Sequence, residues 1–394
     1  MGVGGSGMAG ISYLASKMGY EVTGCDIEES TAYSHKFFYG HSRDHLKGID
    51  LLVVTPAVYF QKTKNPELIE AERRGICLTW QEFLGKYLHK GKKVICVAGT
   101  HGKSTTTAMA GKLLEDAGLD PLVNLGANYK PWKGGARYGK GEYFVTEADE
   151  FYDNFRNYHP EIIILNKVEF DHPDYFKSET QMQDSYKKFI GNLTGKKILI
   201  GQKDSLNKKF NLKVMGKHNQ ENANMAYVLG KKVGIEEETI IKSLESFEGL
   251  ERRMELISDR NGLKVYDDYA HHPTAIKATL DALREKYPKE IVWAVYEAHS
   301  YSRTKALLAK YKGVFNSADK VVIGPIFKAR DTQTFGITEE SIKNASEHKD
   351  CISFNETEKM FKFLKDNLKQ GDVVFVMGAG KSYQWAKQIC NLKI

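Results

Sequence analysis

The sequence predicts an α/β protein of three domains with mostly parallel sheets. First, its 394 residues exceed the length that a single hydrophobic core usually serves. Second, short apolar runs typical of buried parallel strands alternate with helical segments along the whole chain. Third, a basic stretch containing glycine, at residues 90–93, predicts a linker between two such blocks. We therefore expect domains at residues 1–90, 91–246 and 247–394.

Each block contains strands and helices in alternation. In the first block, the apolar run at 50–54 predicts a strand, and residues 66–74 predict a helix. The second block opens with a strand at 94–97 and continues with buried strands near 143–145 and 162–165. In the third block, four apolar runs are each followed by a turn and a helical segment: 265–266, 291–295, 321–323 and 373–376.

Composition narrows the class of protein. Hydrophobic residues make up 41% of the chain and charged residues 27%, which is ordinary for a globular protein. No apolar run reaches the roughly 18 residues that a membrane span needs, and the start lacks a secretion signal. The five cysteines are scattered, as in reduced cytosolic proteins. The net charge of +7 comes without an arginine-rich block. We expect a cytoplasmic protein that binds neither membrane nor nucleic acid, and a phosphate-rich small substrate would suit its charge.

The strongest local signal is a phosphate loop between a strand and a helix. It consists of Gly99, Thr100, His101, Gly102, Lys103, Ser104 and Thr105. Glycines let backbone amides approach phosphate oxygens, and the following helix adds partial positive charge. Lys103 can bridge terminal phosphates, and the Ser104 hydroxyl can bind magnesium. The helix should run over 104–117 and stop at Gly118. The spacing departs from the general pattern, which has a glycine where this chain has Val97.

A carboxylate and an imidazole follow the neighbouring predicted strands. Glu147 lies just beyond the run at 143–145, and His172 follows the next buried strand by a few residues. The carboxyl edge of an open α/β sheet is where ligands bind. Together with Ser104, these side chains predict a site for one or two Mg²⁺ ions beside the phosphate loop.

Three further polar clusters accompany the predicted domain edges. His218 and Asn219 lie at the start of a helix, and Arg252 and Arg253 lie next to the second predicted boundary. An arginine there could stabilise charge on a transferred phosphoryl group. The third cluster ends a strand and starts a helix, and it contains Asp267, Asp268, His271 and His272. In that helix, the expected buried face is Ile276, Leu280 and Leu283.

Five motifs of the chain occur in the order found in the Mur ligases, and the resemblance to that family extends over residues 2 to about 380. The motifs are 99–104, 146–150, 218–219, 252–253 and 267–274. The shortened phosphate loop of that family also accounts for Val97. The resemblance implies an N-terminal Rossmann-like UDP-binding domain, a central P-loop ATPase domain and a C-terminal Rossmann-like domain.

The resemblance also extends to the first domain. Its glycine loop is similar to one that meets the pyrophosphate of a UDP-sugar, and the implied substrate-binding residues are Gly4, Gly5, Gly7, Met8, Asp26, Thr55, Pro56 and Ala57. The family usually has several residues before this loop, which form a first strand. Here the loop begins at Gly2. This departure leaves substrate affinity and the stability of the first domain open.

The resemblance implies an ADP-forming amide synthesis in peptidoglycan biosynthesis. The carboxylate of UDP-N-acetylmuramate would attack ATP to give an acyl phosphate, which an incoming amine then attacks. Lys103, Arg253 and Mg²⁺ on Ser104, Glu147 and His172 would neutralise phosphate. His218, Asn219 and Asp268 would position nucleotide or substrate, with His271 and His272 near the reacting centre. The enzyme would work as a monomer or homodimer on small molecules.

The chain resembles two subfamilies of Mur ligases, which differ in the acceptor that they attach. Residues 297–304 and 328–331 resemble the alanine-adding ligases, although Ala298 and Ser300 replace an expected proline and arginine. Residues 166–172 and 267–276 resemble the recycling ligases, which attach a preformed murein tripeptide. We place L-alanine ahead of the tripeptide.

Two other classes of protein fit the sequence less well. A regulatory nucleotide-binding protein would need fewer of these residues. A folylpolyglutamate synthetase-like enzyme lacks the N-terminal UDP-sugar domain, to which this chain gives about ninety residues. The run at 378–382, Gly-Ala-Gly-Lys-Ser, lacks the earlier glycine of a phosphate loop. We expect it to be a structural or ATP-adjacent turn.

Overall fold

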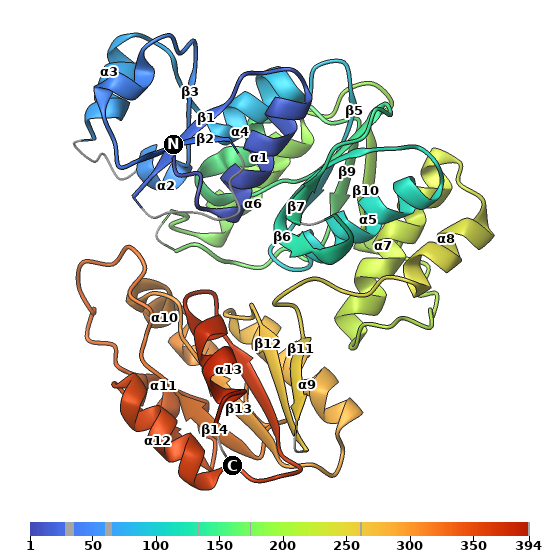
Figure 1. The fold of residues 1–394 in the computed structure, drawn as a ribbon. Helices are drawn as coiled ribbons and strands as arrows, with labels where there is room; N and C mark the ends of the chain where they lie inside the picture. The colour runs from blue at the N-terminus through green and yellow to red at the C-terminus, as the bar shows by residue number, and fades with distance from the viewer. Residues whose placement is uncertain (28–34, 60–64, 133, 174, 261, 393–394) are drawn as a thin grey trace. The chain divides into compact units, whose positions relative to one another are not determined.

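The computed structural model describes residues 1–27, 35–59, 65–132, 134–173, 175–260 and 262–392. These residues divide into two compact units. The first unit holds residues 1–169, 179–210 and 222–247, and the second holds 170–178, 211–221 and 248–394. The α/β class with mostly parallel sheets is confirmed in both (Figure 1).

A six-stranded sheet organises the first unit. Its strand order is β10-β9-β5-β8-β6-β7, and every neighbouring pair is parallel except β6 with β7. The strands are β5 (Lys93–Ala98), β6 (Leu122–Tyr129), β7 (Gly134–Arg137), β8 (Tyr143–Glu147), β9 (Ile162–Leu165) and β10 (Ile198–Gly201). The inner strands are almost wholly buried, as expected for a parallel sheet covered on both faces.

Four long helices accompany this sheet. They are α5 (Lys103–Asp116), α6 (Glu179–Ile190), α7 (Lys217–Val233) and α8 (Glu237–Glu245). Helix α5 packs against β5, β6 and β8 and also contacts α8 (Figure 1). Its predicted end is confirmed, because Gly118 follows the helix with a left-handed φ of 74°.

The first ninety residues form smaller sheets. Strands β1 (Thr23–Asp26) and β2 (Lys36–Tyr39) make one parallel pair, and β3 (Leu52–Val54) and β4 (Cys77–Thr79) make another. The helices here are α1 (Ser6–Lys17), α2 (Pro56–Tyr59), α3 (Pro66–Arg73) and α4 (Trp80–Phe83). Helix α1 packs against β6 and β7 of the large sheet. The described residues of this part of the chain therefore show two short parallel pairs.

The second unit contains another six-stranded sheet, ordered β11-β12-β16-β13-β14-β15. Only β11 with β12 is antiparallel. The strands are β11 (Glu255–Arg260), β12 (Leu263–Asp268), β13 (Val292–Tyr296), β14 (Lys320–Ile323), β15 (Cys351–Ser353) and β16 (Val373–Met377). The helices are α9 (Pro273–Lys286), α10 (Tyr301–Leu307), α11 (Glu339–Ser346), α12 (Thr357–Asn367) and α13 (Ser382–Ile389).

Alternation along the central strands of this sheet builds a core on each face. In β13, Val292 and Ala294 join one apolar cluster, whereas Trp293 and Val295 join the other. Helix α9 covers the first face through the predicted residues Ile276, Leu280 and Leu283, which are fully buried. Helices α12 and α13 contribute to the second face. The sheet is thus buried on both sides, and its strand ends remain as the edge where polar side chains gather.

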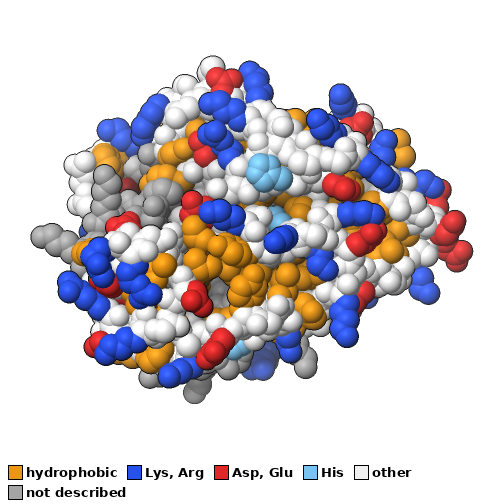
Figure 2. All heavy atoms as spheres, turned by 90° about the horizontal axis from the view of Figure 1, so that it is seen from above, with side chains coloured by type: hydrophobic (Ala, Val, Ile, Leu, Met, Phe, Trp, Pro, Cys, Tyr) orange, Lys and Arg blue, Asp and Glu red, His pale blue; other side chains and the backbone are white. Residues whose placement is uncertain are grey.

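The distribution of surface charge and the character of the helices are relevant to nucleic-acid and membrane binding. The face in Figure 2 carries Lys and Arg side chains interspersed with Asp and Glu, and hydrophobic side chains gather between them. None of the helices in the described part of the chain combines the length and apolar character that crossing a bilayer requires.

Candidate active site

The phosphate loop joins β5 to α5, as the sequence predicts. Gly99 and Gly102 have positive φ angles of 128° and 77°, which favour glycine. A Cβ on Gly102 would lie 2.3 Å from Asn222 Oδ1, and one on Gly99 would lie 2.9 Å from Asn166 Cβ. The glycines are therefore required by the loop's conformation and by two asparagines packed behind it, a reason that local sequence did not reveal.

The first turn of α5 is arranged to receive an anion. No side chain caps this helix, whose cap residue is Gly102. The first N–H groups of an α-helix have no acceptor within the helix, and they carry partial positive charge. Ser104 is buried and Thr105 half-buried in this turn. The sequence prediction of a phosphate-binding helix start thus has the expected geometry.

Lys103 is held in place by two oxygen atoms. Its Nζ donates to the Gly99 carbonyl at 2.7 Å and to Glu150 Oε2 at 2.8 Å. Burial by itself would lower the pKa of Lys103, but the carboxylates of Glu150 and Asp149 outweigh it and raise the pKa. Lys103 is therefore a fixed cation at the loop.

Glu147 lies at the same edge of the sheet. It is the last residue of β8 and not, as expected, a residue beyond the strand. In the parallel ladder it pairs with Val97, close to the end of β5. Its Oε1 accepts a hydrogen bond of 2.6 Å from Gly126 N, and its charge also contributes to the raised pKa of Lys103. Of two predicted metal ligands, Glu147 thus ends β8, and Ser104 lies in the helix that follows the neighbouring strand β5.

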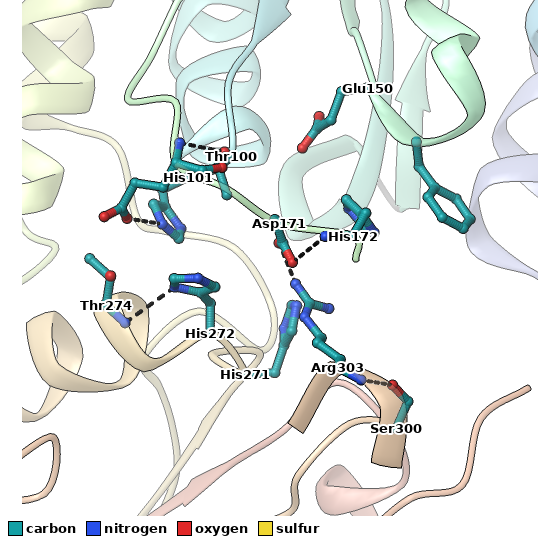
Figure 3. Close-up of polar contacts among 12 residues, drawn as sticks. Thr100, His101, Glu150, Asp171, His172, His271, His272, Thr274, Ser300 and Arg303 are labelled. Atoms are coloured by element: carbon teal, nitrogen blue, oxygen red, sulfur yellow. Dashed lines mark hydrogen bonds and ion pairs between the residues drawn. The ribbon is translucent and has the colours of Figure 1, made fainter. Parts of the chain in front are cut away.

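The start of the loop is tied to the segment after β9. Thr100 Oγ1 donates to Glu169 O at 2.7 Å, and His101 Nε2 lies 2.6 Å from Glu169 Oε2 (Figure 3). The hydrogen bond from His101 lowers the pKa of Glu169 to about 2, despite partial burial. Thr100 and His101 therefore fix the loop, and Glu169 is an anion at neutral pH.

A buried network of amide side chains, which was not predicted from the sequence, supports the loop. Asn166 Nδ2 donates to His101 O at 3.2 Å and to Thr106 Oγ1 at 3.0 Å. Thr106 Oγ1 in turn donates to Asn222 Oδ1 at 3.2 Å. The position of Asn166, directly after a buried strand, was a signal for it. Asn222 carried no comparable signal, and Glu150 was marked only as the last residue of the 146–150 motif.

The glycine loop of the first domain meets two of its predicted partners. Gly4 N donates to Asp26 Oδ2 at 2.8 Å, at the end of β1. A Cβ on Gly2 would lie 2.7 Å from Thr55 Cγ2, so the loop also approaches the residue before α2. Gly5 caps α1 without a side-chain hydrogen bond. The structure therefore brings this loop, Asp26 and Thr55 together.

The other predicted residues of the first domain lie nearby in the chain. Gly7 is in the first turn of α1, and a Cβ there would come no closer than 4.0 Å to Trp80. Met8 is buried and packs in the interior. Pro56 and Ala57 start α2.

In the second unit, Asp171 and Arg303 form a buried ion pair (Figure 3). Burial would raise the pKa of Asp171, but Arg303 and neighbouring histidines outweigh it and hold that pKa well below its ordinary value. Asp171 Oδ1 also accepts a hydrogen bond of 2.7 Å from His172 N. His172 has a left-handed φ of 54°, a strained conformation for a histidine. Arg303 belongs to α10 and was not singled out from the sequence.

His172, the third predicted metal ligand, thus belongs to the second unit, whereas Ser104 and Glu147 belong to the first. His271 also lies in the second unit, with its Nδ1 2.9 Å from Tyr269 O. Burial, with Arg303 adding to it, lowers the pKa of His271. The same causes lower the pKa of His299 to about 4. Both imidazoles are therefore neutral at pH 7.

The cluster after β12 has mostly structural contacts. His272 caps α9 by accepting a hydrogen bond of 3.2 Å from Thr274 N (Figure 3). Asp268 accepts hydrogen bonds of 2.7 Å from the amides of Met254 and Ala270. Burial raises the pKa of Asp268 to about 6, opposed by the charge of Arg253.

The two adjacent arginines have different environments. Arg252 donates to Asp267 Oδ2 at 3.2 Å and to Gly378 O at 2.9 Å, so it is held by its own unit. Arg253 places its guanidinium 5.0 Å from the ring centre of Tyr269. Arg253, the predicted ATP-directed cation, thus contacts an aromatic ring, whereas Arg252 is bonded to Asp267 and Gly378.

His218 and Asn219 lie in the first turn of α7. Asn219 is buried, and its Nδ2 donates to Met215 O at 2.6 Å. His218 is close to the preceding turn, since a Cβ on Gly216 would lie 2.6 Å from His218 Cε1.

The glycine run at 378–382 is a structural turn. The amides of Lys381 and Ser382 donate to the carboxylate of Glu297 at 3.1 and 3.0 Å. A Cβ on Gly380 would lie 2.5 Å from Phe327 Cγ. A buried carboxylate of the protein thus occupies the amides that a phosphate would need, in agreement with the structural alternative of the sequence analysis.

A strand-to-helix phosphate loop with a buried lysine and strand-end carboxylates defines a nucleotide-binding α/β protein of the P-loop class. Three family models match the chain: "Mur ligase family, catalytic domain" at residues 1–91, "Mur ligase middle domain" at 97–208 and "Mur ligase, glutamate ligase domain" at 252–380. The chain is 34% identical to a UDP-N-acetylmuramate–L-alanine ligase of Acetivibrio thermocellus, over 98% of this chain and 93% of the relative. It is 32% identical to the ligase of the same name from Alkaliphilus metalliredigens, over 99% and 96%. The chain belongs to the Mur ligase family, whose members are ATP-dependent ligases.

Solved structures share the fold. The UDP-N-acetylmuramate–alanine ligase of Thermotoga maritima matches with a TM-score of 0.80 at 24% identity, covering 99% of this chain and 97% of that one. A murein peptide ligase of Psychrobacter arcticus matches with a TM-score of 0.71 at 24% identity, covering 100% and 98%. At this identity the likeness concerns the fold, and it supports the three-domain α/β architecture.

Proposed function

We propose that the protein joins L-alanine to the carboxyl group of UDP-N-acetylmuramate, with ATP hydrolysed to ADP and phosphate, in peptidoglycan biosynthesis. The observation that carries this proposal is similarity over nearly the whole chain to relatives named for that activity. Such relatives are 31–34% identical and align with 96–100% of the chain. The murein tripeptide is the less favoured acceptor, because these curated relatives carry the alanine ligase name.

The ATP phosphates would lie at the start of α5. The helix N-terminus attracts anions, and Lys103 supplies a fixed cation in a partly buried setting, where charge interactions are strong. A phosphoryl group reaching Lys103 would compete with Glu150 for its ammonium group. The loop residues from Gly99 to Thr105 would contribute their backbone, with Thr100 and His101 held through Glu169.

Magnesium fits the donors at this edge. Hydroxyl and carboxylate oxygens are the ligands that Mg²⁺ prefers; Ser104 offers a hydroxyl in the first turn of α5, and Glu147 offers a carboxylate at the end of the neighbouring strand β8. The ion would neutralise charge on the phosphates during transfer. We propose His172 as a further ligand.

The reaction needs an activated carboxyl group, since a free carboxylate does not react with an amine under mild conditions. Phosphoryl transfer from ATP would convert it to an acyl phosphate, and attack by the amine of alanine would then expel phosphate. The work of the protein is to hold the reactants and balance their charge. We assign Arg253 to the transferred phosphoryl group, and His218, Asn219 and Asp268 to positioning. His271 and His272 would face the reacting centre.

The UDP-sugar would bind at the loop of the first domain. The N-terminus of α1 has no side-chain cap, so its first amides, including that of Gly7, suit a diphosphate. Gly4 and Gly5 would line this site, with the amide of Gly4 donated to Asp26. Met8, Asp26, Thr55, Pro56 and Ala57 would complete this site. We also propose domain limits at 1–90, 91–246 and 247–394, a monomeric or homodimeric state, and a cytoplasmic location.

The test is phosphate release from ATP and Mg²⁺ in the presence of UDP-N-acetylmuramate. L-Alanine is compared with L-Ala-γ-D-Glu-meso-diaminopimelate as the acceptor, and the product mass is measured. Turnover with alanine alone is expected. Turnover only with the tripeptide would show that the tripeptide, and not alanine, is the acceptor. A folded protein that binds ATP but acts on neither acceptor would overturn the proposal.

A further inference from the structure

A cluster of three potential metal ligands lies in the first ninety residues, away from the phosphate loop. Cys25 belongs to β1, His41 follows β2, and Glu67 lies in the first turn of α3. Cys25 and Glu67 are buried, at 3% and 2% exposure, and His41 is half-buried. Three separate elements of the chain thus direct a thiol, an imidazole and a carboxylate to one point.

The separations between the ligand atoms fit a tetrahedral ion. Cys25 Sγ lies 3.6 Å from His41 Nδ1 and 3.2 Å from Glu67 Oε2, and His41 Nδ1 lies 3.3 Å from Glu67 Oε2. A tetrahedral Zn²⁺ with bonds of about 2.0–2.3 Å would hold such atoms roughly 3.3–3.7 Å apart. The side chains would need to shift by only a few tenths of an ångström, on the order of the difference between these ranges.

The charge of the cluster also calls for a cation. In the described part of the chain, Glu67 forms ion pairs with the imidazoles of His41 and His45 and with no lysine or arginine, although the charge of the buried Met1 ammonium also acts on it. A buried carboxylate usually has a full positive partner or a metal ion. A divalent ion would supply that charge.

Neighbouring residues hold the cluster in shape. Asn65 caps α3 by accepting hydrogen bonds from the amides of Glu67 and Leu68 at 3.0 and 3.2 Å. His45 Nδ1 lies 3.4 Å from Glu67 Oε2, and its ring stacks on Phe38 at a centroid distance of 4.6 Å. Such outer partners orient the ligands of metal sites.

A catalytic thiol is the main alternative for Cys25, and its environment opposes that role. Burial, with Glu67 adding to it, raises the pKa of the Cys25 thiol to about 12. A nucleophilic cysteine needs a lowered pKa and access to its substrate. Cys25 has neither, whereas a bound cation would take its thiolate form.

We propose that Cys25, His41 and Glu67 bind one Zn²⁺ ion with a water molecule as the fourth ligand, as a structural site of the first domain. Binding displaces the thiol proton of Cys25 to solvent, with no change of oxidation state. The ion would join β1, the turn after β2 and α3, which share only a small apolar core with two-stranded sheets. Small units of this kind gain most from such a cross-link.

Asp26 follows Cys25 directly and accepts a hydrogen bond from the amide of Gly4. An ion bound to Cys25 would therefore also stabilise the start of the glycine loop. The Zn²⁺ site itself does not depend on the proposed ligase activity.

The test uses the full chain, stripped with a chelator and titrated with Co²⁺ or Zn²⁺ without nucleotide. We expect one equivalent of metal per chain, a thiolate-to-cobalt charge-transfer band, and a higher Tm with Zn²⁺. Cys25→Ser should lose the band and the Tm shift, whereas Cys77→Ser, at a half-buried cysteine of the same domain, should keep both. A magnesium site of oxygen ligands cannot produce the thiolate band.

Glu67→Gln keeps the size of the side chain and guards against a folding failure of Cys25→Ser. We expect it to weaken Zn²⁺ binding by at least about 10-fold, and His45→Gln by roughly 10–100-fold, as for outer partners of metal ligands. A wild-type chain without the band or the stoichiometric metal would overturn the proposal. So would a band that persists unchanged in folded Cys25→Ser.

Discussion

Lys103 Nζ lies 2.8 Å from Glu150 Oε2, and the two side chains are 16% and 1% exposed. The pair joins the first residue of α5 to the segment after β8, so it links the phosphate loop to the neighbouring strand end. Breaking one side of a buried pair leaves an uncompensated charge, whereas replacing both sides is tolerated better. Variants of the two residues can therefore distinguish the contribution of Lys103 to stability, which depends on Glu150, from its predicted contribution to phosphate binding.

Lys103→Met should lower turnover by at least roughly 10²–10³-fold, because the cation on the transferred phosphate is lost. It should also destabilise the fold by about 3–5 kcal/mol, because Glu150 is left buried and unpaired. The double variant Lys103→Met/Glu150→Gln should recover most of the stability and none of the activity. Steady-state kinetics and urea denaturation measure the two effects.

Lys112→Met on the same helix is the control, since Lys112 is as little exposed as Lys103 but pairs with Asp116 and donates to Ser246 Oγ instead of a loop residue. It should retain turnover. If Lys103→Met were folded and nearly as active as the wild type, the phosphate-loop assignment would be wrong.

Gly4→Val should weaken binding of UDP-N-acetylmuramate by at least about tenfold, or ~1.4 kcal/mol. A Cβ on Gly4 would already lie 3.0 Å from Asp26 Oδ2, so the larger side chain must displace Asp26 or the loop. Calorimetry should show unchanged ATP binding. Gly201→Ala is the control, because its Cβ would meet Asp204 Oδ2 at an ordinary 3.8 Å. Unaltered UDP-sugar affinity in Gly4→Val would indicate a purely structural loop.

Arg303→Met should destabilise the protein by about 3–5 kcal/mol, since Asp171 would remain as a buried, unpaired carboxylate. The double variant Asp171→Asn/Arg303→Met should recover most of this loss in a double-mutant cycle. The single variant Arg303→Met should also raise the pKa values of His271 and His299, because the charge of Arg303 lowers both. Additive effects of the two single variants would argue against coupling.

The same pair predicts a dependence of stability on pH. The folded-state pKa of Asp171 is depressed, so its contribution is complete above the ordinary value of 3.8 and is lost as pH falls below it. Denaturation of wild type and Asp171→Asn at a series of acidic pH values measures this slope. Equal slopes would contradict the pKa direction.

Asp268 should show the opposite sign. Its folded-state pKa is raised from 3.8 to about 6, so between these values the folded protein holds a proton that the unfolded chain has lost. Its contribution to stability is therefore present below pH 3.8 and is lost as pH rises toward 6. Carboxyl NMR titration should place Asp268 near 6, and Arg253→Gln should raise that pKa, because Arg253 opposes the effect of burial. A pKa that does not move in Arg253→Gln would show that the two charges do not interact.

Lys381→Met should leave turnover within about twofold of wild type, in contrast to Lys103→Met, since exposed surface substitutions have small effects. The 378–382 turn already binds the Glu297 carboxylate through the amides of Lys381 and Ser382. Gly380→Ala should instead cost about 1–3 kcal/mol of stability, because its Cβ would overlap Phe327. A large loss of ATP affinity in Lys381→Met would restore the second phosphate loop as a candidate.

Local sequence determined much of the fold and part of the candidate site. The alternation of apolar runs predicted the α/β class, and glycines marked the phosphate loop and the end of α5 at Gly118. These features depend on residues close together in the chain. Helical periodicity, strand burial and positive φ angles act over a few residues, so they can be read from sequence.

Only the tertiary structure decided which distant side chains meet. Glu150 reaches Lys103 across 47 residues, and Asp171 pairs with Arg303 across 132. Cys25 meets Glu67 across 42 residues, although neither was singled out as a metal ligand. Such contacts depend on the order of strands in a sheet and on how loops approach its edge. The chemistry of each side chain was therefore visible in the sequence, but its partner followed from the packing of elements that lie far apart along the chain.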